Sequence, residues 1–402
     1  MRPSRSALLA TLVAVAIVSD AAAQTKKRAR DIGVPLEGTT GPLNAITDVP
    51  GVEVGVSTII QGEGKLVPGQ GPVRTGVTAV LPRGRTATEA VFAAWFSLNG
   101  NGEMTGTTWL EESGFLGGPI MITNTHSVGI VHNAVINWVV KQGKALDWSL
   151  PVVAETWDGG LNDINGFHVK KEHAVAAIES ARTGPVPEGN VGGGTGMTCH
   201  QFKGGTGTAS RRISVLGSPY TVGVLVQCNY GSRRRFTVSG VPVGREIPDL
   251  LPCYRAVASV TEPRTPACSG GPRSDSDGAG SIIVVIATDA PLLPHQLKRV
   301  VKRASLGIGR MGGMGEDSSG DIFVAFSTAN AGADAGDALS QIRAIPNETI
   351  NPVFEATIEA TSEAILNAML AAETMTGADG RTVFALPHDR LLATLAKYGR
   401  GK

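Results

Sequence analysis

The sequence predicts an α/β protein in which helices cover a layered, largely buried sheet. Residues 281–288 form an apolar run without alternation, which is typical of a central strand buried on both faces. Residues 321–328 predict a second buried strand, and residues 351–375 predict a long Ala-rich amphipathic helix. Buried strands mixed with helices in one chain favour a layered α/β sandwich.

Shorter patterns predict further elements. Alternating valines indicate a strand within residues 42–60, and short β-branched runs indicate strands at 75–81 and 220–229. The apolar residues at 87–98 lack strict alternation, and this run breaks at Asn99-Gly-Asn-Gly102. Helices are expected at residues 110–115, 131–140, 169–181 and 294–305.

Composition favours a large core and argues against a nucleic-acid-binding protein. The chain has 402 residues, 42% of them hydrophobic and 18% charged, with a formal net charge of +1. The low charged fraction favours extensive burial. A nearly neutral chain lacks the basic footprint of nucleic-acid binders, so no such partner is expected.

The N-terminus has the order of a secretory signal peptide. Arg2 and Arg5 precede an apolar run from Ala7 to Ser19, and small residues follow as far as Ala23. We therefore expect residues 1–23 to be removed and the protein to be periplasmic or secreted. The run is shorter than the roughly 20 residues that cross a bilayer, and no membrane association is expected.

The four cysteines are expected to be structural. Their spacing contains no Cys-x-x-Cys, so no metal site is expected. Export would permit disulfides, and Cys253 and Cys268, which flank a short polar loop, could form one. Cys199 and Cys228 lie in apolar or Gly-rich surroundings, and we expect them to be buried free thiols.

Two conspicuous patterns are interpreted as structural. The basic run Lys26-Lys27-Arg28 with Arg30 is expected to be a solvated tail. The glycine-rich segment 192–207 resembles a phosphate cradle, but no Gly-Lys-Ser/Thr follows it. Tight backbone turns are therefore favoured there over nucleotide binding.

The junction before the central strand carries the catalytic hypothesis. Residues 246–280 are polar, rich in proline and glycine, and predict a flexible linker that ends at Gly280. A loop that simply meets a strand is the commoner structure, but the Ser281 hydroxyl could also attack the Gly280 carbonyl. Glycine would help the scissile peptide to distort because it has no Cβ.

A serine freed in this way would not need a histidine. Its own α-amino group has a pKa near ~7.7–8 and could take the hydroxyl proton. The seven histidines have no Gly-x-Ser-x-Gly partner motif, and surface or packing roles are expected for them.

Several segments together resemble the L-aminopeptidase D-amidase/esterase family, which includes the β-peptidyl aminopeptidases. Residues 280–297 resemble the start of that family's small subunit, and residues 318–328 resemble its second strand. The likeness runs from about Arg30 to the C-terminus. Further similar motifs lie at residues 42–48, 154–156, 161–163, 188–197 and 372–377.

The resemblance implies an αββα sandwich formed by a self-processed precursor. Residues 24–280 would be the large subunit and residues 281–402 the small subunit, separated by cleavage between Gly280 and Ser281. It also implies no cofactor, short peptides or aminoacyl amides and esters as substrates, and a tetramer of αβ pairs.

The resemblance further implies catalytic roles. Ser281 would be the nucleophile. Ser319 and Asp321 match the family's serine-x-acid positions, which hold the α-amine and orient the nucleophile, and their spacing places both on one strand face. Asn229 matches the oxyanion-hole residue, a donor worth roughly 3–4 kcal/mol in comparable sites.

Two residues are implied to bind substrate. Glu155 matches the acid that binds the free amine, and a carboxylate in its apolar stretch needs a cationic partner. Some relatives carry tyrosine at position 157, where this chain has Trp157. An indole N–H can donate but cannot titrate, so we expect Trp157 to shape the substrate pocket.

The leading hypothesis is therefore a self-processing N-terminal-serine aminopeptidase, with the preference among β-, L- and D-residues left open. One alternative is an acyltransferase of the ornithine acetyltransferase type, which Ser281 and the signal peptide disfavour because those enzymes use threonine in the cytoplasm. Another is a non-catalytic periplasmic binding protein with an uncleaved chain, but two symmetric lobes are not evident.

Overall fold

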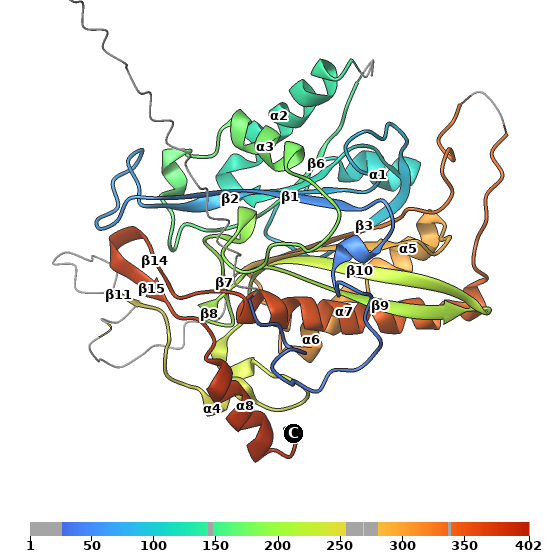
Figure 1. Ribbon diagram of the computed structural model, residues 1–402. Helices are drawn as coiled ribbons and strands as arrows, with labels where there is room; N and C mark the ends of the chain where they lie inside the picture. The colour runs from blue at the N-terminus through green and yellow to red at the C-terminus, as the bar shows by residue number, and fades with distance from the viewer. Residues whose placement is uncertain (1–25, 144–147, 255–267, 269–279, 337–338, 402) are drawn as a thin grey trace, which may run out of the picture.

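The computed structural model describes residues 26–143, 148–254, 268, 280–336 and 339–401. Two β-sheets lie face to face, and helices cover the outer face of each (Figure 1). The expected αββα sandwich is therefore confirmed. The expected signal peptide and most of the linker at 246–280 lie outside the described residues.

The first sheet has four strands in the order β1-β2-β5-β6, and helices α2 and α3 cover its outer face. β5 and β6 are parallel, and the other pairs are antiparallel. The bounds are β1 Glu53–Gln61, β2 Val73–Leu81, β5 Ile120–Asn124, β6 Val152–Thr156, α2 Val128–Lys141 and α3 Lys171–Glu179.

The second sheet has six strands in the order β4-β3-β13-β12-β10-β9, and helices α5, α6 and α7 cover its outer face. Its central pair, β12 and β13, is parallel. The bounds are β3 Val91–Gly100, β4 Phe115–Leu116, β9 Gly205–Val215, β10 Ser218–Asn229, β12 Ser281–Thr288, β13 Gly320–Ser327, α5 Pro294–Val301, α6 Ala304–Arg310 and α7 Asn351–Leu370.

Smaller elements lie around the sandwich. β7 pairs with β8, and β11, β15 and β14 form a three-stranded sheet. Their bounds, with those of the remaining helices, are β7 Thr198–Cys199, β8 Phe202–Lys203, β11 Cys253–Tyr254, β14 Met375–Thr376, β15 Arg381–Val383, α1 Thr107–Ser113, α4 Val243–Glu246 and α8 His388–Lys397.

Strand β12 contributes side chains to the apolar clusters on both faces of the six-stranded sheet. Its side chains alternate between two buried clusters, one beneath the helices and one between the sheets. Every residue of β12 is buried, as the unbroken apolar run predicts. Ile282, Val284 and Ile286 face the helices, whereas Ile283, Val285 and Ala287 face the other sheet.

Most predicted elements are confirmed, with shifts at their ends. The strand predicted at 281–288 is β12, and the helix predicted at 351–375 is α7, which ends at Leu370. The helix predicted at 294–305 is two helices, because the chain turns between α5 and α6. Part of the predicted linker is ordered, since β11 pairs with β15.

The prediction for the cysteines is half right. Cys253 and Cys268 form the disulfide that was considered for them. The prediction of free thiols at Cys199 and Cys228 is wrong, because these residues also form a disulfide. The turn between β7 and β8 brings Cys199 against the end of β10, a contact between distant segments that the sequence does not reveal.

The prediction of a solvated tail at residues 26–30 is also wrong. Arg28 forms an ion pair with Glu188, with Nε 2.7 Å from the carboxylate, and Arg30 forms one with Glu363 at 3.0 Å. Ala29 between them is fully buried. The basic residues therefore attach residues 26–30, the N-terminal arm, to β9 and α7, because their acidic partners lie inside the protein.

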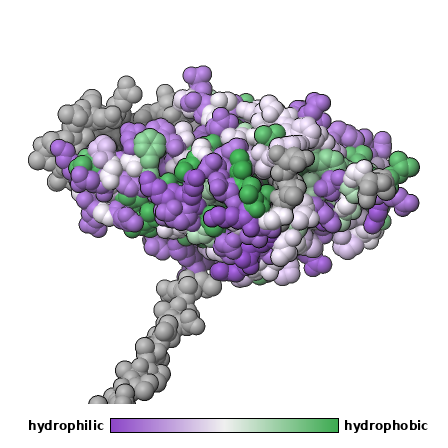
Figure 2. Space-filling view, turned by 90° about the horizontal axis from the view of Figure 1, so that it is seen from above, coloured by the Kyte–Doolittle hydropathy of each residue, from purple (hydrophilic) through white to green (hydrophobic). Residues whose placement is uncertain are grey.

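The surface shows no single dominant apolar area in the view of Figure 2, where hydrophilic and hydrophobic side chains are interspersed. Within the described part of the chain, none of the helices combines the length and apolarity needed to cross a membrane.

Candidate active site

Ser281 is the first residue of β12 and lies at the centre of the six-stranded sheet. It pairs with Asn229 on one side and Gly320 on the other. The side chain is buried, and its Oγ accepts a hydrogen bond from the Gly320 N–H at 3.2 Å. Since the hydroxyl proton is not used in this bond, it is available to a base.

Gly280 packs tightly against the end of β10. A Cβ at this position would lie 1.9 Å from the Asn229 carbonyl oxygen and 3.0 Å from the Tyr230 Cα. Only glycine fits here, which is the physical reason for the Gly-Ser pair at the junction.

Ser319 and Asp321 lie beside Ser281 at the start of β13. The Ser319 hydroxyl donates to Asp321 Oδ1 at 2.6 Å, and both residues are buried. Burial raises the pKa of the Asp321 carboxyl to about 6, opposed by the Ser319 hydrogen bond and reinforced by the charge of Glu316. The pair therefore offers a proton acceptor close to neutrality next to the serine.

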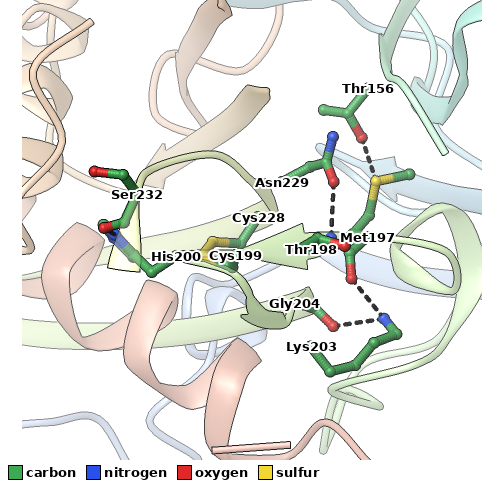
Figure 3. The surroundings of a disulfide bond; sticks show 10 residues. All are labelled: Thr156, Met197, Thr198, Cys199, His200, Lys203, Gly204, Cys228, Asn229 and Ser232. Carbon is green, nitrogen blue, oxygen red and sulfur yellow. Dashed lines mark hydrogen bonds between the residues drawn. A yellow bond between two sulfur atoms is a disulfide. The ribbon is translucent and has the colours of Figure 1, made fainter. Parts of the chain in front are cut away.

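Asn229 ends β10, and its amide is held from both sides. Its Oδ1 accepts from the Thr198 N–H at 2.8 Å, and its Nδ2 donates to the Trp157 carbonyl at 2.9 Å. Figure 3 shows the Cys199–Cys228 disulfide next to this amide. The Thr198 bond fixes Nδ2 as the donor atom of an amide that lies opposite Ser281 in the sheet.

Glu155 reaches the same place from the other sheet. It is buried on β6, accepts from the Glu103 N–H at 3.0 Å and is bonded by the Thr125 hydroxyl. Burial raises the pKa of its carboxyl, and these two hydrogen bonds partly offset the rise. A Cβ at Gly102 would lie 3.2 Å from both Glu155 Oε1 and Gly320 Cα, so one glycine separates the acid from the strand beside Ser281.

Trp157 contributes through its main chain and borders the site with its ring. Its carbonyl binds Asn229, whereas its side chain is 51% exposed. A Cβ at Gly159 would lie 2.7 Å from the ring, so the indole lies flat over this glycine. The exposed indole ring therefore borders the opening of the site.

The sequence did not identify several residues that support the site. Asn99 accepts from the Asp321 N–H at 2.8 Å and donates to the Glu316 carbonyl at 2.9 Å. Asn101 donates to the Ser318 carbonyl at 2.8 Å. The break at Asn99-Gly-Asn-Gly102 was the available signal, because two asparagines alternating with glycines commonly bind nearby backbone.

All the residues predicted for the site thus lie together. Strand pairing joins Ser281 to Asn229 and to the turn that carries Ser319 and Asp321. Glu155 approaches from the facing sheet. The arrangement combines a serine hydroxyl, a hydrogen-bonded Ser–Asp pair, a side-chain amide and a buried carboxylate.

Comparison with known proteins identifies the family. Residues 44–383 match the model of peptidase family S58. The chain is 55% identical over 391 residues to the beta-peptidyl aminopeptidase BapA of Sphingosinicella microcystinivorans, covering 97% of each protein. It is 44% identical to the protein of the same name from Sphingosinicella xenopeptidilytica, covering 96% of this chain and 94% of that one.

A solved structure agrees with this assignment. The L-aminopeptidase D-Ala-esterase/amidase of Ochrobactrum anthropi, described as a prototype of the serine aminopeptidases with a variant of the Ntn hydrolase fold, superposes with a TM-score of 0.83. The two are 45% identical over 93% of this chain and 99% of that one. The chain belongs to peptidase family S58 and has the fold of the N-terminal-nucleophile hydrolases.

Proposed function

We propose that this chain is an aminopeptidase that cleaves its own Gly280–Ser281 bond and then uses Ser281 as its N-terminal nucleophile. The observation that carries the proposal is the position of Ser281. It begins the central strand of an S58 peptidase, directly after a glycine that no other residue can replace and between Asn229 and Gly320. The same position disfavours a binding protein without catalysis.

Self-cleavage would begin at the Ser281 hydroxyl. Oγ attacks the Gly280 carbonyl carbon and loses its proton, and the C–N bond breaks as the nitrogen takes up a proton to become the α-amine. Water then hydrolyses the resulting ester, which leaves the Gly280 carboxylate and restores the hydroxyl. In this proposal the Ser319–Asp321 pair accepts the proton before an α-amine exists, which the hydrogen bond between them and their position at the start of β13 support.

Peptide hydrolysis would use the same atoms with the new amine as base. The α-amine takes the Oγ proton while Oγ attacks the substrate carbonyl carbon. The amine proton then goes to the leaving nitrogen, and water hydrolyses the acyl-enzyme. The Asn229 Nδ2 would leave the Trp157 carbonyl to donate to the oxyanion, an interaction worth about 3–4 kcal/mol.

Glu155 would select substrates with a free amino terminus. Its buried carboxylate has hydrogen-bond donors and the charge of His126 in reach, but it forms no ion pair among the described residues, and a substrate ammonium supplies one. Short peptides and aminoacyl amides or esters are therefore the proposed substrates. The names of the Sphingosinicella relatives favour β-amino N-terminal residues among them.

Export and assembly are further parts of the proposal. The basic, apolar and small-residue order of residues 1–23 supports cleavage after Ala23 and a periplasmic or secreted enzyme. A tetramer of αβ pairs is proposed from the family resemblance alone.

The decisive experiment combines electrophoresis with N-terminal sequencing. The purified wild-type protein should give two chains, the smaller beginning Ser-Ile-Ile-Val, and should hydrolyse aminoacyl amides. Ser281→Ala should remain one chain without activity, whereas Ser318→Ala, at an exposed neighbouring serine, should resemble wild type. An intact single chain that still hydrolyses these substrates would contradict the mechanism.

A further inference from the structure

Three acidic or phenolic groups on the segments that flank the start of β12 have buried oxygens without a hydrogen-bond partner in the described part of the chain. They are the Tyr230 hydroxyl, Asp321 Oδ2 and both carboxylate oxygens of Glu316. Tyr230 is fully buried and follows Asn229, the strand partner of Ser281. A buried carboxylate without a donor or a cation is costly, so this group of residues lacks a partner.

The three groups lie within electrostatic reach of one another. Burial raises the pKa of the Tyr230 phenol, and the negative charges of Asp321 and Glu316 raise it further. The charge of Glu316 also raises the pKa of Asp321, and Asn99 links the two main chains, because it donates to the Glu316 carbonyl and accepts from the Asp321 N–H. Asp321 lies opposite Ile282 in the register of β12 and β13, so this group of acids lies one residue from Ser281.

The main chain of Glu316 is held firmly. It begins a turn that the Ser319 N–H closes by donating to the Glu316 carbonyl at 2.9 Å, and Asn99 donates to the same carbonyl at 2.9 Å. Asn101 binds the next part of the turn at Ser318. The end of β3 and the residue after it thus fix the turn that carries Glu316. The Glu316 carboxylate is buried although the turn itself lies at the surface.

We propose that Glu316 is a positioning residue that forms an ion pair with the α-ammonium which Ser281 acquires on cleavage. The inference rests on the proposed self-cleavage. Breaking the Gly280–Ser281 bond converts a neutral amide nitrogen into a basic amine, the cation that this group of acids lacks. Asp321 and Glu316 then accept from the amine, and the Tyr230 hydroxyl can donate to either carboxylate.

This pairing has a measurable consequence for the catalytic base. The titratable groups packed around the start of β12 are Asp321 and Glu316 from β13 and its preceding turn, Tyr230 after β10, and Glu155 from β6. None of the described Lys, Arg or His residues forms an ion pair with Glu316 or Asp321. A nearby carboxylate stabilises the ammonium, so removing the Glu316 charge should lower the pKa of the amine.

The test measures the Ser281 amine directly. The rate of acetylation of the small chain's N-terminal peptide, followed by mass spectrometry against pH, reports the fraction of free amine. Glu316→Gln should move this curve to lower pH by about one unit, and the acidic limb of kcat/KM should move with it. Asp317→Asn, at the exposed next residue, should leave both in place.

The variants at Glu316 and the wild-type protein separate the inference about Glu316 from the proposed self-cleavage. Glu316→Asp keeps the charge on a shorter side chain and should shift the curve less than Glu316→Gln. A Glu316→Gln curve that superposes on wild type overturns the inference and leaves the proposed function standing. A folded but uncut Glu316→Gln also overturns it, since the assigned role begins after cleavage. A wild-type protein without a Ser281 terminus overturns both.

Discussion

At Gly280 the requirement for self-cleavage is steric, and it can be tested with one methyl group. A Cβ would lie 1.9 Å from the Asn229 carbonyl oxygen, so Gly280→Ala must move the scissile carbonyl away from Ser281 Oγ. We expect cleavage to slow by about 100-fold, as misplacements near 1 Å do in enzymes.

A time course of the two chains on denaturing electrophoresis measures this effect. Gly117→Ala is the matched control, because a Cβ there meets no atom within 4 Å. If Gly280→Ala is cleaved at the wild-type rate, the junction can accommodate a Cβ, and the steric argument is wrong.

Glu155 makes a prediction about binding rather than about the chemical step. Removing its charge in Glu155→Gln should raise KM by about 10- to 100-fold, the range for a hydrogen bond to a charged group, with a smaller effect on kcat. Because burial raises the pKa of this carboxyl, falling pH should protonate it and raise KM in wild type. The Glu155→Gln variant should lose this dependence.

Steady-state kinetics against pH check the prediction. Glu103→Gln is the control: the exposed Glu103 side chain makes no bond to Glu155, and because its charge raises the pKa of Glu155, its loss should only move the pH dependence of KM to lower pH. A KM for Glu155→Gln equal to that of the Glu103→Gln control would exclude Glu155 from ammonium binding.

The sequence predicts best the helices and strands whose hydrophobic pattern reflects burial in the core. The apolar run of β12 and the periodicity of α7 are strong enough to place both within a few residues. Strand β9 was missed because Gly205-Thr-Gly-Thr208 resembles a loop. In the structure a Cβ at Gly207 would lie 2.1 Å from the Ala364 carbonyl oxygen, so the glycine lets α7 pack closely on the sheet.

The site was predictable only in part, for a related reason. Ser281 stood out through its place between a linker and a strand, but Asn229, Glu155, Ser319 and Asp321 depended on the family resemblance. The contacts that support them join residues far apart in the chain, such as Asn99 with Asp321. A single sequence gives no register between strands, so such partners become visible only in the folded protein.

The Cys199–Cys228 disulfide links two elements that together orient Asn229. Cys199 follows Thr198, whose N–H binds the Asn229 amide, and Cys228 precedes Asn229 (Figure 3). Replacing both cysteines by alanine should lower the free energy of unfolding by about 3.6 kcal/mol, the loop-closure value for a sequence separation of 29 residues. It should also lower kcat more than it raises KM, because the Asn229 amide, the proposed oxyanion donor, loses its support.

Urea unfolding and steady-state kinetics measure the two effects. The matched control is the double alanine variant at Cys253 and Cys268, which removes the other disulfide away from Asn229. Equal losses of kcat in the two double variants would contradict a specific role in holding the amide.

For the whole molecule, the site depends on the packing of the two sheets, because each sheet contributes some of its residues. Glu155 comes from the four-stranded sheet, whereas Ser281, Asn229 and Asp321 come from the six-stranded sheet. The apolar cluster between the sheets therefore sets the distance from the Glu155 carboxylate to Ser281. Anything that changes the packing of the layers is expected to affect binding and catalysis together.

The N-terminal arm is part of this packing and provides a test at the scale of the whole protein. Arg28 binds Glu188 and the carbonyls of Leu43 and Asn44 at 3.0 and 2.8 Å. Burial raises the pKa of the Glu188 carboxyl to about 7, even though the charge of Arg28 opposes the rise. Arg28→Ala would leave this carboxylate buried without its cation, which costs about 3–5 kcal/mol when a buried pair loses one partner.

The stability lost in Arg28→Ala should increase as the pH rises. A buried acid with a raised pKa is protonated in the folded state at low pH, and its ionised form destabilises the fold as pH rises. The difference in thermal stability between wild type and Arg28→Ala should therefore be small at pH 5 and grow as pH rises through about 7. Lys27→Ala, at an exposed neighbour, should show no such difference. A constant difference across this range would mean that Arg28 stabilises the fold through its carbonyl contacts and not through Glu188.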